Sequence, residues 1–339
     1  MGGDHQASGG PYSDVMPRRV IGVDLGGTSV IVGEVDAELA VHRRLQRPVV
    51  GLDQPTLLRT VQDAVHEALA GAAGDIAGIG FGVPSLIDQR TGTSVVAVNQ
   101  PLDNFPFGAV MSERLGLPVF VDNDANVAAL AEHRAGAAIG ASEVVMITVG
   151  TGIGGALILG GQLYRGSVGA AGELGHMVID SGGPPCQGNC PNRGCLESLA
   201  SGTALAREAR RVAEEQPDSA LGRAMSDGRV LAGPLVTELA HDGDKAALEV
   251  LDLIGTRLGI GIASYVNIFN PQVVVIGGGV LGAGELLLAP ARAEVARRSL
   301  PPSRDVVRIV NAHFGAEAGM VGAAALALDG LAARIEETA

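Results

Sequence analysis

Residues 20–36 read VIGVDLGGTSVIVGEVD, and this stretch decides how the rest of the chain is interpreted. An apolar run, a Gly-Gly turn and a second apolar run are the pattern of two strands joined by a tight turn. Residues 144–159, VVMITVGTGIGGALIL, repeat the order of strand, Gly/Thr turn and strand. The turns at Gly26 and Thr151 are 125 positions apart, which is far too long for a solenoid repeat. The sequence therefore predicts a duplicated domain with one such hairpin in each half.

The rest of the chain alternates between strand and helix patterns. Apolar runs predict buried strands at IAGIGFGVPS, LPVFVDND and QVVVIGGG. Apolar residues spaced three and four apart predict a helix at 54–71. Further helices are expected at 125–136, 203–214 and 244–266, and an alanine-rich one at 316–336. Asp124 stands where the N-cap of the second of these helices is expected. Strands that alternate with helices predict an α/β architecture.

Composition narrows the class of protein. A length of 339 residues suggests about two domains, and the net charge of −13 argues against a polyanion such as DNA as partner. We find no run of about 20 apolar residues, so we expect no membrane span. Residues 1–17 lack an apolar signal core and are interpreted as a disordered leader. We therefore expect a cytoplasmic, reducing setting, in which structural disulfides are disfavoured.

The glycine-rich loops admit two kinds of ligand. GTGIGG at 150–155 and GGGVLG at 277–282 both match the G-x-G-x-x-G dinucleotide fingerprint. A returning strand follows the first loop, whereas a helix follows the second, which makes the second the better dinucleotide candidate or a tight structural turn. Lys245 is the single lysine, so a Walker A loop is absent. Backbone N–H groups of two glycine hairpins, with hydroxyls of Thr28 and Thr151 and with Mg²⁺, favour phosphate binding instead.

Two further patterns carry polar chemistry. In VDNDAN, residues 121–126, Asp124 is a candidate general base and Asn123 a candidate hydrogen-bonding partner for a polyol, while a helix cap is the structural alternative. All three cysteines lie within ten residues after a histidine, and the four candidates for tetrahedral zinc are His176, Cys186, Cys190 and Cys195. Buried free thiols remain an alternative, whereas a redox pair would more often show C-x-x-C.

Together these motifs resemble the ROK family of sugar kinases, within the actin/hexokinase-like ATPase superfamily. The matching pieces occur in family order: DLGGT (24–28), VDNDAN (121–126), GTGIGG (150–155), GELGH (172–176), CPNRGCLE (190–197) and IGGG (276–279). The resemblance implies a two-lobed α/β fold of duplicated ribonuclease H-like domains with a zinc-binding loop. Residues 18–134, completed by a helix at 316–337, would form the N-terminal lobe, and residues 135–315 the C-terminal lobe.

The resemblance also implies an activity, namely ATP-dependent phosphorylation of a hexose at its 6-hydroxyl. Glucose is the first choice, while N-acetylmannosamine, N-acetylglucosamine, fructose and mannose remain open. The implied cofactors are ATP, Mg²⁺ and a structural Zn²⁺. A homodimer or higher homo-oligomer is expected because dimers are common in the family. Repressors of the family carry a helix-turn-helix before the kinase-like core, and about 19 residues precede the first strand here, too few for that module.

Roles follow position by position. Asp24 would help to hold Mg²⁺, and Asp124 would be the base at the phosphorylated hydroxyl. The nucleotide would be bound by glycines and threonines, which are Gly26, Gly27, Thr28, Gly150, Thr151, Gly152, Gly277 and Gly278. Sugar hydroxyls would be bound by polar side chains, which are Asn104, Asn123, Glu173, His176 and Glu197.

The chain departs from the family pattern at three places. Ser85 stands where the family usually has glycine after Gly-x-Pro. Three residues separate Cys186 from Cys190, whereas the commonest family spacing has one. The surroundings of Asn104, PLDNFPF, match the family only loosely.

Overall fold

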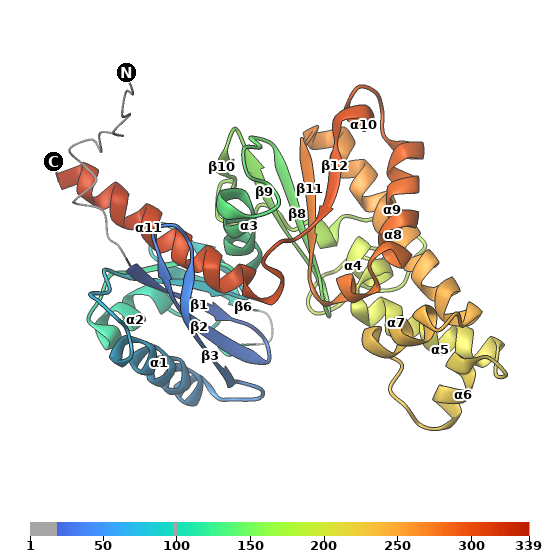
Figure 1. The fold of residues 1–339 in the computed structure, drawn as a ribbon, viewed down its shortest axis with the longest axis horizontal. Coiled ribbons are helices and arrows are strands. Elements are labelled where there is room, and N and C mark those ends of the chain that lie inside the picture. Colours follow the sequence, from blue (N-terminus) through green and yellow to red (C-terminus); the bar gives the residue numbers. More distant parts are fainter. Residues whose placement is uncertain (1–18, 98–99, 339) are drawn as a thin grey trace, which may run out of the picture. The chain divides into compact units, whose positions relative to one another are not determined.

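The computed structural model describes residues 19–97 and 100–338, and the predicted leader at 1–17 lies outside them. Contacts between Cα atoms group the described chain into two units (Figure 1). The first contains the residues up to Ser85, Arg90–Asp124 and the chain from Gly319 onward. The second contains Leu86–Gln89 and Ala125–Ala318.

The first unit is built on a five-stranded sheet with the order β3-β2-β1-β4-β7. The strands are β1 (Arg19–Leu25), β2 (Ser29–Asp36), β3 (Val41–Pro48), β4 (Ile79–Val83) and β7 (Val119–Asn123). The pairs β1–β2 and β2–β3 are antiparallel, whereas β1–β4 and β4–β7 are parallel. Strands β5 (Ser85–Asp88) and β6 (Thr93–Ala97) form a separate pair.

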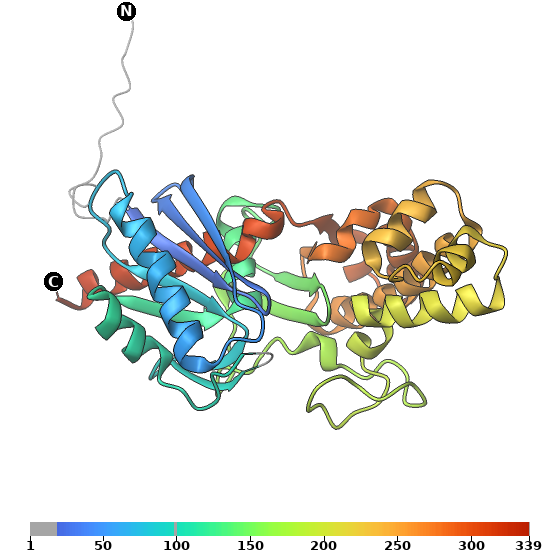
Figure 2. The same cartoon turned by 90° about the horizontal axis from the view of Figure 1, so that it is seen from below.

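Helices cover both faces of this sheet. Helices α1 (Gln54–Ala70) and α2 (Phe107–Leu115) lie on one face and α11 (Ala318–Thr338) on the other, as Figure 1 and, from below, Figure 2 show. The predicted helix at 54–71 is thus confirmed as α1. Asp53 begins it, because its side chain accepts a hydrogen bond from the Thr56 N–H, as an N-cap does.

A row of three glycines lets α11 lie directly on the sheet. Gly33, Gly22 and Gly80 are paired across β2, β1 and β4. A Cβ atom at Gly22 would lie 2.0 Å from the Met320 carbonyl oxygen, and one at Gly80 would lie 1.7 Å from that of Ala323. Any larger residue there would push the helix backbone away from the sheet.

The apolar character of α11 follows from this packing. By length and composition alone, the stretch Gly315–Glu337 is apolar enough to cross a membrane. No membrane span is expected from the sequence, because it has no uninterrupted run of about 20 apolar residues. Half of its most apolar window is buried inside the protein. Its hydrophobicity is therefore accounted for as that of a core helix.

The second unit repeats the topology of the first. Its sheet has the order β10-β9-β8-β11-β12, with strands β8 (Val144–Val149), β9 (Ile153–Leu159), β10 (Gln162–Leu163), β11 (Val273–Gly277) and β12 (Arg308–Asn311). Here too the first three strands pair antiparallel and the last two parallel. The two sheets share one topology, and the predicted α/β architecture is confirmed.

Alternate residues of the central strands face two different cores. Val145 and Ile147 pack with the large helical layer, and Val144 and Met146 pack with α3 (Asp124–Ala135). The helical layer comprises α4 (Leu196–Ala200), α5 (Gly202–Glu215), α6 (Ala220–Ser226), α7 (Gly233–His241), α8 (Lys245–Phe269), α9 (Glu285–Arg298) and α10 (Ser303–Val306).

The contacts group α3 from Ala125 onward with the second unit, whereas the sequence analysis placed residues up to 134 with the first lobe. The buried face of α3 explains this difference. Ala128 and Ala129 pack in one cluster with Val144, Met146 and Val273 of the second sheet.

Candidate functional site

The first glycine hairpin forms a tight turn at the end of β1. The Gly26 N–H donates to the Ser29 carbonyl at 2.9 Å and closes the turn. The Gln100 side-chain amide donates to the Gly26 carbonyl at 2.8 Å, and the Val49 N–H donates to the Thr28 carbonyl at 3.0 Å. Gly27 and Thr28 are exposed at the tip. Hydrogen bonds thus hold the base of the turn, and the tip is open to a ligand.

Two carboxylates of the first unit interact electrostatically beside this turn. Asp24 lies near the end of β1, and Asp124 directly follows β7. Burial, and next the charge of Asp124, raise the pKa of Asp24 to about 7. The start of α11 approaches the same carboxylate, because a Cβ atom at Gly319 would lie 2.5 Å from Asp24 Oδ2. Bringing two such carboxylates together favours a bound cation, and carboxylate oxygens suit Mg²⁺.

Asn123 and Asn104 are placed by the segment that contains β5 and β6. The Asn123 amide nitrogen donates to the Ser85 carbonyl at 3.3 Å. Asn104 is exposed and has a left-handed backbone with φ 46°, and its N–H donates to the Val95 carbonyl at 3.2 Å. Asparagine tolerates this conformation better than most residues.

The second glycine hairpin joins β8 to β9, which pair antiparallel. This confirms the prediction that a returning strand, rather than a helix, follows GTGIGG. The Gly150 N–H donates to the Gly152 carbonyl at 2.9 Å. The first residues of α5 hold the turn from behind: Gly202 N–H donates to Gly150 O at 2.8 Å, and the Thr203 hydroxyl donates to Thr151 O at 2.8 Å. Thr151 itself is exposed.

Glu197 connects this turn to the cysteine cluster. Its Oε2 accepts a hydrogen bond from the Ile153 N–H at 2.8 Å, and its Oε1 lies 3.8 Å from Cys186 Sγ. A Cβ atom at Gly152 would lie 2.3 Å from Glu197 Oε2, so glycine is needed for the carboxylate to come this close. Through Glu197, the second glycine hairpin and the cysteine cluster are therefore in contact within the second unit.

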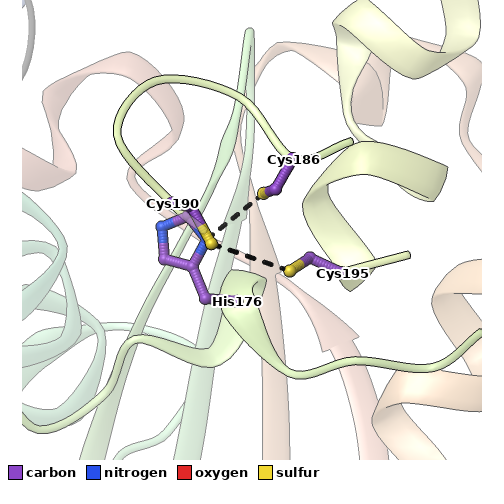
Figure 3. A group of neighbouring side chains, drawn as sticks. All are labelled: His176, Cys186, Cys190 and Cys195. Carbon is purple, nitrogen blue, oxygen red and sulfur yellow. Dashed lines mark hydrogen bonds between the residues drawn. The ribbon is translucent and has the colours of Figure 1, made fainter. Parts of the chain in front are cut away.

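The four predicted metal ligands converge (Figure 3). The candidate ligand atoms of His176, Cys186, Cys190 and Cys195 all lie within 4.8 Å of one another. His176 Nδ1 is 3.4 Å from Cys186 Sγ, and Cys190 Sγ is 3.9 Å from Cys195 Sγ. Zn–S and Zn–N bonds in a tetrahedral site would separate such ligands by about 3.5–3.8 Å. Burial, and next the neighbouring thiols, raise the pKa of Cys186. The donor set and its spacing fit a tetrahedral metal.

Backbone hydrogen bonds, rather than regular secondary structure, hold the loop that carries these residues. The Cys186 N–H donates to Asn192 O at 2.9 Å, and the Leu196 N–H donates to Met177 O at 2.9 Å. Gly194 has φ 64°, and a Cβ atom there would lie 1.5 Å from Asp180 O. A glycine next to the last cysteine is thus required for this end of the loop to approach Asp180.

His176 faces two ways. Its Nδ1 is directed to the cysteines, while its Nε2 is 3.9 Å from Oε2 of the exposed Glu173. One ring nitrogen can therefore bind a metal while the other lies beside a carboxylate, where a polar ligand could be shared by both side chains.

The third glycine loop forms a tight turn at the end of β11. Gly277 ends β11, and Gly278 has φ 95° with its would-be Cβ 2.3 Å from Val149 O. A 3₁₀ turn, Gly279–Ala283, separates it from α9. GGGVLG therefore does not open a helix directly, as the dinucleotide fingerprint does, and the dinucleotide alternative loses its structural basis.

Two features that support the site were not predicted from the sequence. Gln100 holds the first glycine turn, and no motif marked it. Arg207 and Arg257 donate to Ser198 O at 2.9 Å and Leu199 O at 3.2 Å in α4, the helix that contains Glu197, and both pair with Glu208. Charged residues at helical spacing in α5 could have indicated an ion-pair network. They could not have indicated that its arginines also bind the carbonyls of α4.

Comparisons with known proteins agree with these motifs. The ROK family profile matches residues 20–330. A glucokinase of Halalkalibacterium halodurans is 38% identical over 90% of this chain and 93% of its own, and one of Thermotoga maritima is 34% identical over 92% and 98%. Xylose repressors also match, at 32% identity or less.

A solved structure extends the likeness to three dimensions. The ROK family glucokinase of Streptomyces griseus, in complex with glucose and AMPPNP, is 35% identical, with a TM-score of 0.80 over 92% of this chain and 99% of that one. The profile thus extends from the first strand into the last helix, and the two relatives and the solved structure each cover 90–92% of the chain. The chain belongs to the ROK family.

Proposed function

We propose that the protein transfers a phosphate from ATP to the 6-hydroxyl of glucose. The observation that carries this proposal is the interacting pair Asp24 and Asp124 beside the exposed glycine turn of the first unit. The glucokinase relatives and the structure of a relative with glucose and AMPPNP support glucose and ATP as the substrates.

Asp124 is the residue to accept the proton of the attacking hydroxyl. It is partly exposed at the first position of α3, so its carboxylate is accessible while the helix fixes its backbone. Asp24 would help to bind Mg²⁺, which neutralises phosphate charge when it is bound. Because a nearby cation favours the ionised form, it would lower the raised pKa of Asp24.

The glycine turns would approach the phosphates of ATP. Gly27 and Thr28 are exposed at one turn and Thr151 at the other, and each turn is braced from behind by hydrogen bonds. Glycine lets backbone N–H groups come close to phosphate oxygens, and the threonine hydroxyls add donors. Gly277 and Gly278 would lie near the adenosine.

Sugar hydroxyls would be bound by five side chains, which are Asn104, Asn123, Glu173, His176 and Glu197. Zinc would act through the loop that carries its four ligands and leads into α4, the helix that contains Glu197. Bound by His176 Nδ1 and the three cysteines, it would fix the imidazole so that Nε2 is presented beside Glu173. The metal is then structural, and the carboxylates contact the substrate.

The variant Asp124→Asn tests the proposed base. Turnover, measured as ADP release in a coupled assay with glucose, should fall about 10²- to 10⁴-fold because the amide cannot accept the proton. The matched control is Asp53→Asn, at the start of α1, where asparagine caps as well as aspartate. Near-normal turnover of a folded Asp124→Asn protein contradicts the role of Asp124.

The same assay across a panel of sugars tests the substrate. Glucose should give the highest kcat/KM among glucose, mannose, fructose, N-acetylglucosamine and N-acetylmannosamine. A preference for an N-acetylated sugar would contradict glucose as the substrate and indicate an N-acetylhexosamine kinase instead.

A further inference from the structure

Ser85 takes a place in the fold that a glycine could not fill. Its side chain is 2% exposed, and its Oγ lies 2.5 Å from Ser94 Oγ and 2.9 Å from Val96 O. A hydroxyl has one proton to give, so Ser85 donates to the Val96 carbonyl and accepts from Ser94. Ser94 is fully buried, so without Ser85 its hydroxyl would lose a partner where water cannot easily replace it.

These bonds fasten Ser85 to the strand that holds Asn104. Ser94 exchanges two backbone hydrogen bonds with Phe105, each 2.9 Å, and the Asn104 N–H donates to Val95 O at 3.2 Å. The Asp103 carboxylate accepts from the Ala97 N–H at 2.8 Å. The left-handed backbone of Asn104 is therefore held by pairing with β6, and β6 is held by the Ser85 hydroxyl.

The main chain of Ser85 supports the other asparagine. Its carbonyl accepts a hydrogen bond from Asn123 Nδ2 at 3.3 Å, which leaves the orientation of the Asn123 amide oxygen dependent on the position of this carbonyl. Ser85 thus contacts Asn123 through its backbone and the support of Asn104 through its side chain. All these residues belong to the first unit.

We propose that Ser85 is a positioning residue that fixes Asn104 and Asn123 relative to one another. The proposal rests on the proposed function, in which both asparagines bind sugar hydroxyls. Ser85 does not contact the sugar itself, since its hydroxyl is buried and engaged. Its loss would let the two asparagines move independently, so that affinity for the sugar falls while the ATP site and the base are unaffected.

The variant Ser85→Ala removes only the hydroxyl. We expect the KM for glucose to rise about 5- to 10-fold, the scale of one lost buried hydrogen bond, with kcat and the KM for ATP within about twofold of wild type. The matched control is Thr91→Ala, which removes an exposed hydroxyl pair with Thr93, 2.8 Å apart, beside the same two strands. A merely structural role would lower thermal stability or the active fraction without this selective change in KM.

A double-mutant cycle adds a second test. Because Ser94 acts through Ser85, the KM of Ser85→Ala/Ser94→Ala should be no higher than that of Ser85→Ala alone. An unchanged glucose KM in a folded, active Ser85→Ala protein overturns the proposal and leaves the proposed function intact. Glucose binding by calorimetry separates the two further. Wild type that binds no sugar and turns over none refutes both. Wild type that binds glucose without turnover refutes the proposed function alone, and weaker glucose binding by Ser85→Ala then supports the positioning role, whereas equal binding overturns it.

Discussion

At the scale of single residues, Cys186 is the one whose place the sequence left most open. Its spacing to Cys190 is two residues longer than the common family spacing, which could have carried it out of the cluster. The structure brings its sulfur to 3.4 Å from His176 Nδ1 instead. Gly188, with φ 59°, lies between the two cysteines and supplies a turn that accommodates the longer segment.

Cys186 is therefore expected to be a zinc ligand. The purified protein should contain about one zinc per chain, and Cys186→Ser should lower zinc affinity at least tenfold, because one thiolate of four is lost. Metal content measured by mass spectrometry after dialysis against a weak chelator tests this. His66→Gln, which alters an exposed histidine of α1, is the control for losing a potential ligand elsewhere. Full zinc retention by Cys186→Ser would exclude it from the site.

The residue types of the candidate site could be predicted from the sequence, but their supports could not. Asp124, the glycine turns and the Cys₃His set are marked by local patterns, since each chemistry needs particular residue types at close spacing. Gln100 and Ser85 contribute through bonds to residues far away in the chain, or through a carbonyl that any residue possesses. Such contacts leave no local pattern.

At the scale of elements, α11 and the sheet beneath it depend on one another. The sequence predicted a helix at 316–336, and α11 confirms it. Period and composition alone could not show that three glycines, at positions 22, 33 and 80, form its contact surface, because they are brought together only by strand pairing.

Strand β3 was not predicted, since its sequence VHRRLQRP has the charged residues of an exposed edge strand.

Gly22→Ala should destabilise the protein by about 3 kcal/mol, the upper end of the usual cost of overpacking, because the new methyl would meet the backbone of α11 rather than a flexible side chain. Urea unfolding followed by circular dichroism measures this. Gly74→Ala is the control, since a Cβ atom there has no neighbour within 4 Å, and we expect its stability within about 0.5 kcal/mol of wild type. Equal midpoints for the two variants would show that α11 is not seated directly on the glycine row.

At the scale of the whole molecule, duplication organises both units. The two hairpins at 20–36 and 144–159 predicted it, and each is the centre of a sheet with the same strand order and directions. The units differ in what covers the sheets. The second has a large helical layer, in which Glu208 pairs with Arg207, Arg211 and Arg257. The helices of this layer could be predicted from the sequence. That Arg207 and Arg257 also donate to carbonyls of α4, the helix that contains Glu197, could not.

This network predicts how global stability responds to acid. Burial opposes ionisation of Glu208, but the hydrogen bonds from Arg257, Arg211 and Arg207 outweigh it and lower the pKa of Glu208 to about 2. Because the folded-state pKa lies below the unfolded value, the network stabilises the fold fully above about pH 4.5. That contribution is lost as the pH falls from 4.5 toward 2.

Glu208→Gln should therefore be less stable than wild type at pH 7 and approach wild-type stability near pH 2–3. Other carboxylates also titrate in this range and relieve the charge of −13, so the informative quantity is the difference in unfolding free energy between the two proteins at each pH. Glu215→Gln, whose exposed carboxylate pairs with Arg211 at 2.8 Å, should differ little from wild type throughout. A stability difference for Glu208→Gln that does not shrink in acid would mean that the residue contributes through packing rather than through its charge.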